Sequence, residues 1–84
     1  MRVWIRRRLW TITDAPISDY GDCDGSKRLV RIQAGQPDRD RLDTLIHETL
    51  HALYPKMSER QIFDEAAVLS KVIWKDGWRR QNER

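Results

Sequence analysis

The stretch of residues 38–54, DRDRLDTLIHETLHALY, sets the helical half of the fold. Its apolar residues recur every three or four positions, the spacing that places side chains on one face of an α-helix. They are Leu42, Leu45, Ile46, Leu50 and Leu53, with Thr49 in the same stripe. Pro37 and several aspartates surround the first turn, where the helix dipole favours negative charge, and Pro55 ends the pattern. The sequence therefore predicts a helix over about residues 38–54.

The chain after this helix predicts a second helix, over about residues 58–76. Ser58 and Gln61 form a capping-box pattern at its start, and Gly77 follows as a residue that commonly ends helices. The apolar residues at helical spacing are Ile62, Ala66, Leu69, Val72 and Ile73. Because the connection between the two helices is short, we expect them to lie side by side and antiparallel.

The chain before the first helix predicts strands. Residues 2–13 and 27–33 are rich in β-branched and aromatic residues, which favour strands. Residues 14–25 are dense in turn-forming residues and predict a long loop. We therefore expect residues 1–84 to form a single α+β domain. In it, a small antiparallel β-sheet of two or three strands is followed by the two helices.

Size and composition limit what such a domain can be. The chain has 84 residues, of which 39% are hydrophobic and 35% charged, so it can bury one modest core but no large enclosed cofactor cavity. Its single cysteine, Cys23, excludes a disulfide within the chain and is typical of a reducing compartment. No apolar stretch approaches the roughly 20 residues that a membrane span needs. These features predict a soluble cytoplasmic protein.

The distribution of charge leaves nucleic acid open as a partner. Residues 1–10 carry four arginines, and residues 71–84 carry five basic against two acidic residues, although the whole chain has a net charge of only +3. Basic ends can contact phosphate groups. The simpler interpretation is that these charges keep the protein soluble.

The motif His47-Glu48-Thr49-Leu50-His51 lies inside the first predicted helix and contains the only two histidines of the chain. Residues four apart project from the same helix face, so both imidazoles can bind one metal ion. In such HExxH motifs the ion is zinc, which lowers the pKa of its bound water toward about 7, and the adjacent glutamate accepts the water's proton. The motif predicts His47 and His51 as zinc ligands and Glu48 as the catalytic general base.

A catalytic zinc site needs a third protein ligand, and no further histidine is available. On a helical wheel of the second predicted helix, Glu65 falls between apolar side chains, where a carboxylate is unusual. Counting residues from the helix ends places Asp64 and Glu65 level with the motif. Glu65 is therefore the predicted third ligand, with Glu59, Asp64 and Cys23 as alternatives.

This combination resembles the gluzincin type of zincin metallopeptidase, in which HExxH on one helix is completed by a glutamate on the next. Among small domains, it is similar to the ImmA/IrrE-like and SprT-like metallopeptidases, over about residues 27–75. The resemblance implies peptide-bond hydrolysis with Zn²⁺, Glu48 as general base and Glu65 beside the motif histidines as ligand. It also implies that a peptide or protein substrate could add as a strand along residues 27–33.

Two residues near the motif are secondary candidates. Asp43 precedes His47 by one helical turn and could orient its ring, or interact with the helix dipole. Tyr54 follows the motif and could donate a hydrogen bond to an oxyanion, or simply pack. The alternative function is a non-catalytic nucleic-acid-binding or protein-binding module with a structural or vestigial zinc site.

Overall fold

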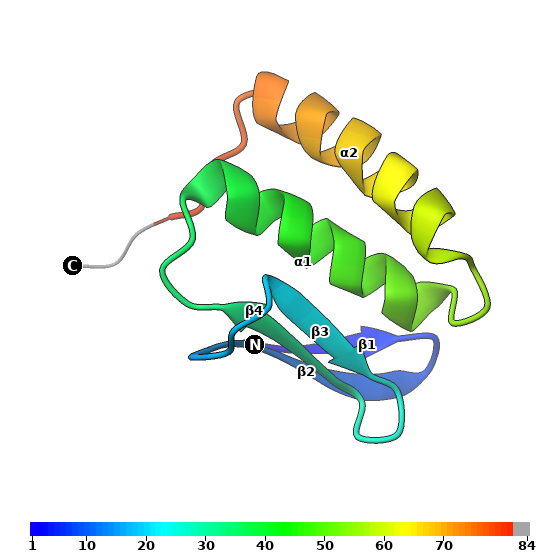
Figure 1. Ribbon diagram of the computed structural model, residues 1–84. Coiled ribbons are helices and arrows are strands. Elements are labelled where there is room, and N and C mark those ends of the chain that lie inside the picture. The colour runs from blue at the N-terminus through cyan, green and yellow to red at the C-terminus, as the bar shows by residue number, and fades with distance from the viewer. Residues whose placement is uncertain (82–84) are drawn as a thin grey trace.

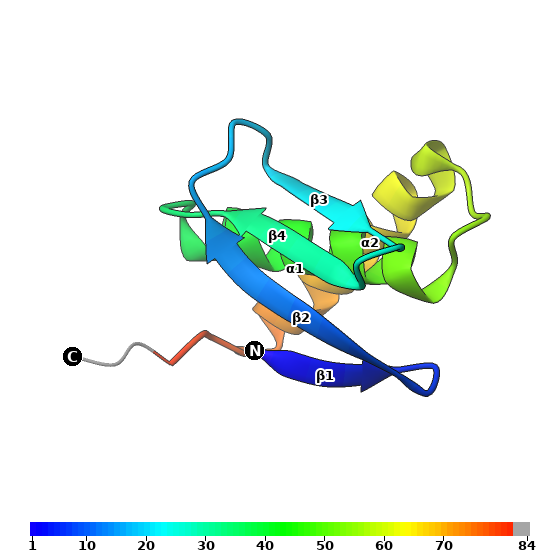
Figure 2. The same ribbon diagram turned by 90° about the horizontal axis from the view of Figure 1, so that it is seen from below.

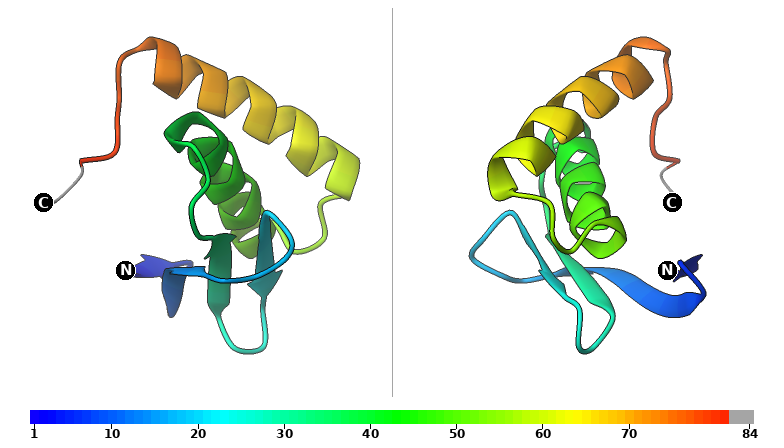
Figure 3. Two further views of the ribbon diagram at one scale, coloured as in Figure 1. Left: turned by 60° about the vertical axis from the view of Figure 1, so that its left-hand side comes forward. Right: turned by 90° about the vertical axis from the view of Figure 1, so that its right-hand side faces the viewer.

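The computed structural model describes residues 1–81 and contains a four-stranded sheet and two helices (Figure 1). The strands are β1 (Arg2–Ile5), β2 (Arg8–Ala15), β3 (Gly21–Asp24) and β4 (Leu29–Gln33), and the helices are α1 (Asp38–Leu53) and α2 (Glu59–Lys75). Helix α1 lies between the sheet and α2, so that the domain has three layers (Figure 3). The α+β class is confirmed, and both helices begin and end within about one residue of their predicted bounds.

The sheet differs from the predicted one in its strand count and in one strand direction. Its order is β1-β2-β4-β3, with β2 and β4 parallel and the other two pairs antiparallel (Figure 2). Residues 2–13, predicted as one strand, form a hairpin that turns at Arg6 and Arg7, whose φ angles are 48° and 68°. Two positive φ angles are what a type I′ hairpin turn requires. Residues 14–25, predicted as a loop, contain β3.

The strand predicted to accept a peptide is an interior strand. Val30 of β4 faces Ile12 of β2 on one side and Cys23 of β3 on the other. Both edges of β4 are therefore occupied by main-chain partners, and the prediction that a substrate adds along residues 27–33 is wrong. The sheet's free edges are β1 and β3, and β3 packs against α1.

Helix α1 has two apolar faces because it is covered on two sides. One face packs on the sheet core formed by the buried residues Ile5, Trp10, Ile12, Val30 and Ile32. The other packs on α2, where Leu50 is buried with Ile62 and Ala66. The polar residues of the helix therefore include two buried ones, Thr44 and Glu48, while the side chains of His47 and His51 stay 17% and 24% exposed.

Polar contacts fix α1 at both ends. Near its start, the Arg41 guanidinium binds Asp14 at the end of β2, with Nη2 2.6 Å from the carboxylate, and this hydrogen bond lowers the pKa of Asp14. Near its end, Arg6 Nε in the hairpin turn donates to the Leu53 carbonyl at 2.8 Å. At the start of α2, Ser58 Oγ accepts from the Gln61 N–H at 3.2 Å, which confirms the predicted cap. The motif therefore sits on a helix held at both termini.

The buried face of α2 is only partly the one that the apolar pattern predicts. Ile62, Ala66 and Ser70 are fully buried, whereas Leu69 and Val72 are 41% and 60% exposed. The apolar residues of this helix occupy two neighbouring stripes, and only one of them contacts α1. The choice of the buried stripe decides which carboxylate of α2 points at the motif.

Candidate metal centre

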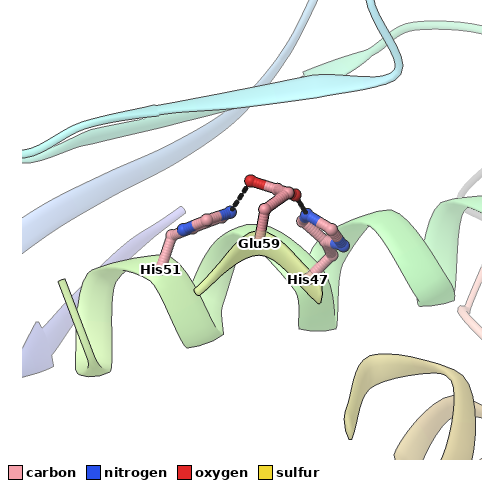
Figure 4. Close-up of side chains that lie close together, drawn as sticks. All are labelled: His47, His51 and Glu59. Carbon is pink, nitrogen blue, oxygen red and sulfur yellow. Dashed lines mark hydrogen bonds and ion pairs between the residues drawn. The ribbon is translucent and has the colours of Figure 1, made fainter. Parts of the chain in front are cut away.

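The side chains of the two motif histidines, which project from α1, and of Glu59, at the start of α2, form one cluster (Figure 4). The Glu59 carboxylate lies between the imidazoles, with Oε1 2.6 Å from His47 Nε2 and Oε2 3.0 Å from His51 Nε2. The ring centroids are 5.1 Å apart. The spacing of four along α1 thus brings both Nε2 atoms to a single carboxylate, as the motif predicts for a single ion.

Glu59 reaches this position because it is in line with the stripe of α2 that packs on α1, although its own side chain is 71% exposed. It is the first residue of that helix, and it precedes Ile62 by three positions and Ala66 by seven. Residues at this spacing share one helix face. Since Ile62 and Ala66 pack on α1, Glu59 also projects toward α1 at the end where the two helices are joined.

Glu65, the predicted third ligand, is exposed on α2 and is not part of this cluster. By helical spacing it shares a face with Leu69 and Val72, which are 41% and 60% exposed. Asp64 is also exposed and pairs with Arg60 one turn earlier, at 3.2 Å. The structure therefore places Glu59, one of the alternative ligands, beside the two histidines, where Glu65 was predicted to lie. The spacing from Glu59 to Ile62 and Ala66 puts the three residues on one face of α2, but only the packing of the helix shows that this face is the one against α1.

Glu48 lies inside the domain beside the cluster. The residue is only 8% exposed, and burial raises the pKa of its carboxyl, while the imidazoles of His47 and His51 oppose that rise. Two surface grooves meet at this residue. The HExxH motif thus places a desolvated carboxylate next to two imidazoles, which is the arrangement that a general base for a nearby water requires.

The grooves lie on either side of the cluster and share Gly21, His47, Glu48 and Glu59 as lining residues. The first, which we call the Asp40 groove, has a volume of about 700 Å³ and is further lined by Asp19, Tyr20, Asp40, Asp43 and Phe63. The second, the Cys23 groove, has a volume of about 680 Å³ and includes Trp10, Asp22, Cys23, His51 and Pro55. The cluster is therefore open to a ligand from two sides.

Cys23, another alternative ligand, does not join the cluster. It lies on β3, is half-buried and packs against the sheet core. Burial raises the pKa of its thiol to about 11, with the Glu48 carboxylate adding to the rise. The thiolate is the form that binds metals, so this environment favours a carboxylate as the third ligand.

The two secondary candidates make other contacts. Asp43 accepts a hydrogen bond from Ser70 Oγ at 3.0 Å, and so links α1 to α2. Tyr54 is exposed, and the Arg6 guanidinium lies 5.1 Å from the centre of its ring. Neither contact orients His47, and Tyr54 does not line either groove described above.

The cluster fits a zinc ion in its donor atoms and in its dimensions. One ligand atom from each of the three residues lies within 4.8 Å of the others. Zinc binds imidazole nitrogen at about 2.0–2.1 Å and carboxylate oxygen at about 2.0–2.2 Å, so ligands of one ion lie roughly 3–4 Å apart. Two histidines and a glutamate are a catalytic donor set that leaves one position for water.

Gly21 of β3 is a site residue that the sequence analysis missed. A Cβ atom there would lie 2.7 Å from Thr44 Cγ2, 3.0 Å from the Arg31 carbonyl oxygen and 3.1 Å from Glu48 Cγ. Only a residue without a side chain lets β3 approach α1 this closely. A glycine within a predicted loop gives no signal of such an approach.

We expect Gly21→Ala to destabilise the domain by about 1–3 kcal/mol, because the added methyl overpacks the contact between β3 and α1. Urea denaturation followed by circular dichroism measures this change. Gly25→Ala is the matched control, since a Cβ there meets nothing within 4 Å. Equal stability of the two variants would contradict the close approach of β3 to α1.

Comparisons with known proteins add no family to this geometry. Comparison with protein-family models, with curated proteins and with solved structures gives no match. Within residues 1–81, neither helix is long and apolar enough to cross a membrane. The functional interpretation therefore depends on the cluster and its grooves.

Proposed function

We propose that this chain is a zinc-dependent metallopeptidase of the gluzincin type that works in the cytoplasm. The observation that carries the proposal is the convergence of His47, His51 and Glu59 at an open surface beside the buried Glu48. Of the other ligands considered from the sequence, Asp64 and Glu65 are exposed outside the cluster, and Cys23 packs against the sheet core. A lone half-buried cysteine suits a reducing compartment.

The chain's residues divide the work of peptide hydrolysis. His47, His51 and Glu59 would hold the ion, which when bound acidifies a water molecule and polarises the substrate carbonyl. Glu48 accepts a proton from the water as its oxygen attacks the carbonyl carbon. The same carboxyl then returns the proton to the amine nitrogen as the C–N bond breaks.

The free edge of β3 is where a substrate backbone would lie. β3 is the edge strand that packs on α1, and Gly21 brings it against Glu48. Exposed N–H and C=O groups of an edge strand can pair with an extended peptide. Such a peptide would pass from one groove to the other, across the cluster.

The proposal is tested by adding zinc to metal-free protein. A ligand present at 100 times its dissociation constant stabilises the folded state by about 2.7 kcal/mol, which corresponds to a melting temperature roughly 10 °C or more higher in a domain of this size. Zinc should also start hydrolysis of unstructured peptides at one ion per chain. Differential scanning calorimetry and a fluorogenic peptide assay measure the two effects. A melting temperature indifferent to zinc, with no hydrolysis, would refute the proposal.

A further inference from the structure

The two grooves are acidic in a chain that is basic overall. The sequence has 16 Lys and Arg residues against 13 Asp and Glu residues. Nevertheless, in the part of the chain that the structure describes, no Lys or Arg lines either groove. Their walls contain the carboxylates of Asp19, Asp22, Asp40, Asp43, Glu48 and Glu59.

The uncompensated charge is concentrated in the Asp40 groove. In the Cys23 groove, Asp22 is paired with Arg31, whose Nε donates to it at 2.9 Å. In the Asp40 groove, no ion pair within residues 1–81 involves Asp19, Asp40 or Asp43. The two charges of a bound zinc ion would be offset by Glu59 and Glu48. The three aspartates would keep their negative charge after the ion binds.

The groove also offers an apolar surface and the carboxylate of Glu48. Tyr20 and Phe63 are both exposed and line the same groove as the aspartates. Aromatic rings of this kind pack against the aliphatic stem of a long cationic side chain. Glu48 is only 8% exposed as a residue, and it lines the same groove. A groove with these features is built to receive a polar ligand.

We infer that the Asp40 groove binds a lysine or arginine side chain of the polypeptide substrate, beside the bond to be cleaved. This inference rests on the proposed function and names its substrate class as basic polypeptide. The aspartates attract the cation, the two aromatic rings cover its stem, and β3 holds the substrate main chain. Because no Lys or Arg of residues 1–81 lines this groove, an acidic side chain would be unfavourable there.

Peptide binding tests the inference without requiring turnover. Two fluorescent nonapeptides that differ only by lysine or norleucine at the central position are titrated into zinc-loaded Glu48→Gln protein. The lysine peptide should bind about tenfold more tightly at low salt, and the difference should shrink as salt is added. In the variant with Asp19→Asn and Asp40→Asn, the preference for the lysine peptide should fall about fivefold, from about tenfold to about twofold. The fall is limited because each exposed charge pair contributes modestly.

The matched control makes the same change of charge elsewhere. Asp64→Asn with Glu65→Gln removes two negative charges from the exposed face of α2, away from the grooves. This control should keep the full lysine preference. An equal loss in both double variants would show only an effect of net charge and would overturn the inference.

The inference and the proposed function fail in different ways. If the unchanged protein binds zinc and cleaves the norleucine peptide, but both peptides bind equally, basic selectivity is wrong and the peptidase proposal stands. If the chain binds no zinc and cleaves nothing, the proposed function is wrong, and with it the substrate class.

Discussion

Replacing Glu48 by glutamine should lower the rate of peptide hydrolysis by about 10²–10⁴-fold and leave zinc bound. The amide has the shape of the carboxylate but cannot accept the proton of the attacking water. Glu48 is not itself a member of the ligand cluster, so the affinity for zinc should change little. The measurement is kcat/KM on one fluorogenic peptide at equal zinc occupancy, determined for both proteins by atomic absorption.

Glu65→Gln is the matched control for this variant. It makes the same chemical change on the exposed face of α2, outside the cluster, and should leave kcat/KM within about twofold, as is usual for a surface substitution. A Glu48→Gln protein that is fully loaded with zinc and hydrolyses at the normal rate would remove Glu48 from the mechanism.

The second large effect is on zinc affinity and separates the two candidate third ligands. Glu59→Ala should weaken zinc binding by more than about 100-fold, because loss of an outer-shell partner alone costs 10–100-fold and Glu59 would contact the ion directly. Glu65→Ala removes the same side chain from the same helix and should leave the affinity within about twofold. Competition with a chromophoric chelator measures both constants.

The folding of each variant must be checked alongside its affinity. Glu59 lies in the first turn of α2, where a negative charge is favoured by the helix dipole by about 0.3–1 kcal/mol. Its replacement should therefore lower stability slightly, without unfolding the domain. If Glu65→Ala instead caused the larger loss of zinc affinity, the packing of α2 on α1 would have to differ from the structure.

The helices could be predicted from the sequence because their signals are local. The apolar residues between Leu42 and Leu53 recur at helical spacing, and Ser58 caps the second helix. His47 and His51 share a helix face by their spacing alone. These features hold whatever the helices pack against. The two histidines and Glu48 therefore came directly from the motif.

The third ligand and the sheet depend on contacts that no local signal contains. Helix α2 has two apolar stripes, and only its packing shows that the stripe of Ile62 and Ala66 is the buried one. Strand β3 consists of Gly21-Asp-Cys-Asp24, residues typical of turns, and is extended because it pairs with β4. The hairpin turn at Arg6 and Arg7 uses positive φ angles that such residues rarely adopt. Tertiary pairing overrides local preference in each case.

The central claim is that one zinc ion is bound by His47, His51 and Glu59, and X-ray absorption at the zinc edge tests it most directly. The expected spectrum shows one ion per chain with nitrogen and oxygen ligands at about 2.0–2.2 Å, including the multiple scattering of two imidazoles. The Glu59→Ala variant should lose one of the light-atom ligands. A sulfur ligand at about 2.3 Å would implicate Cys23 and contradict the claim, and so would a spectrum without imidazole scattering.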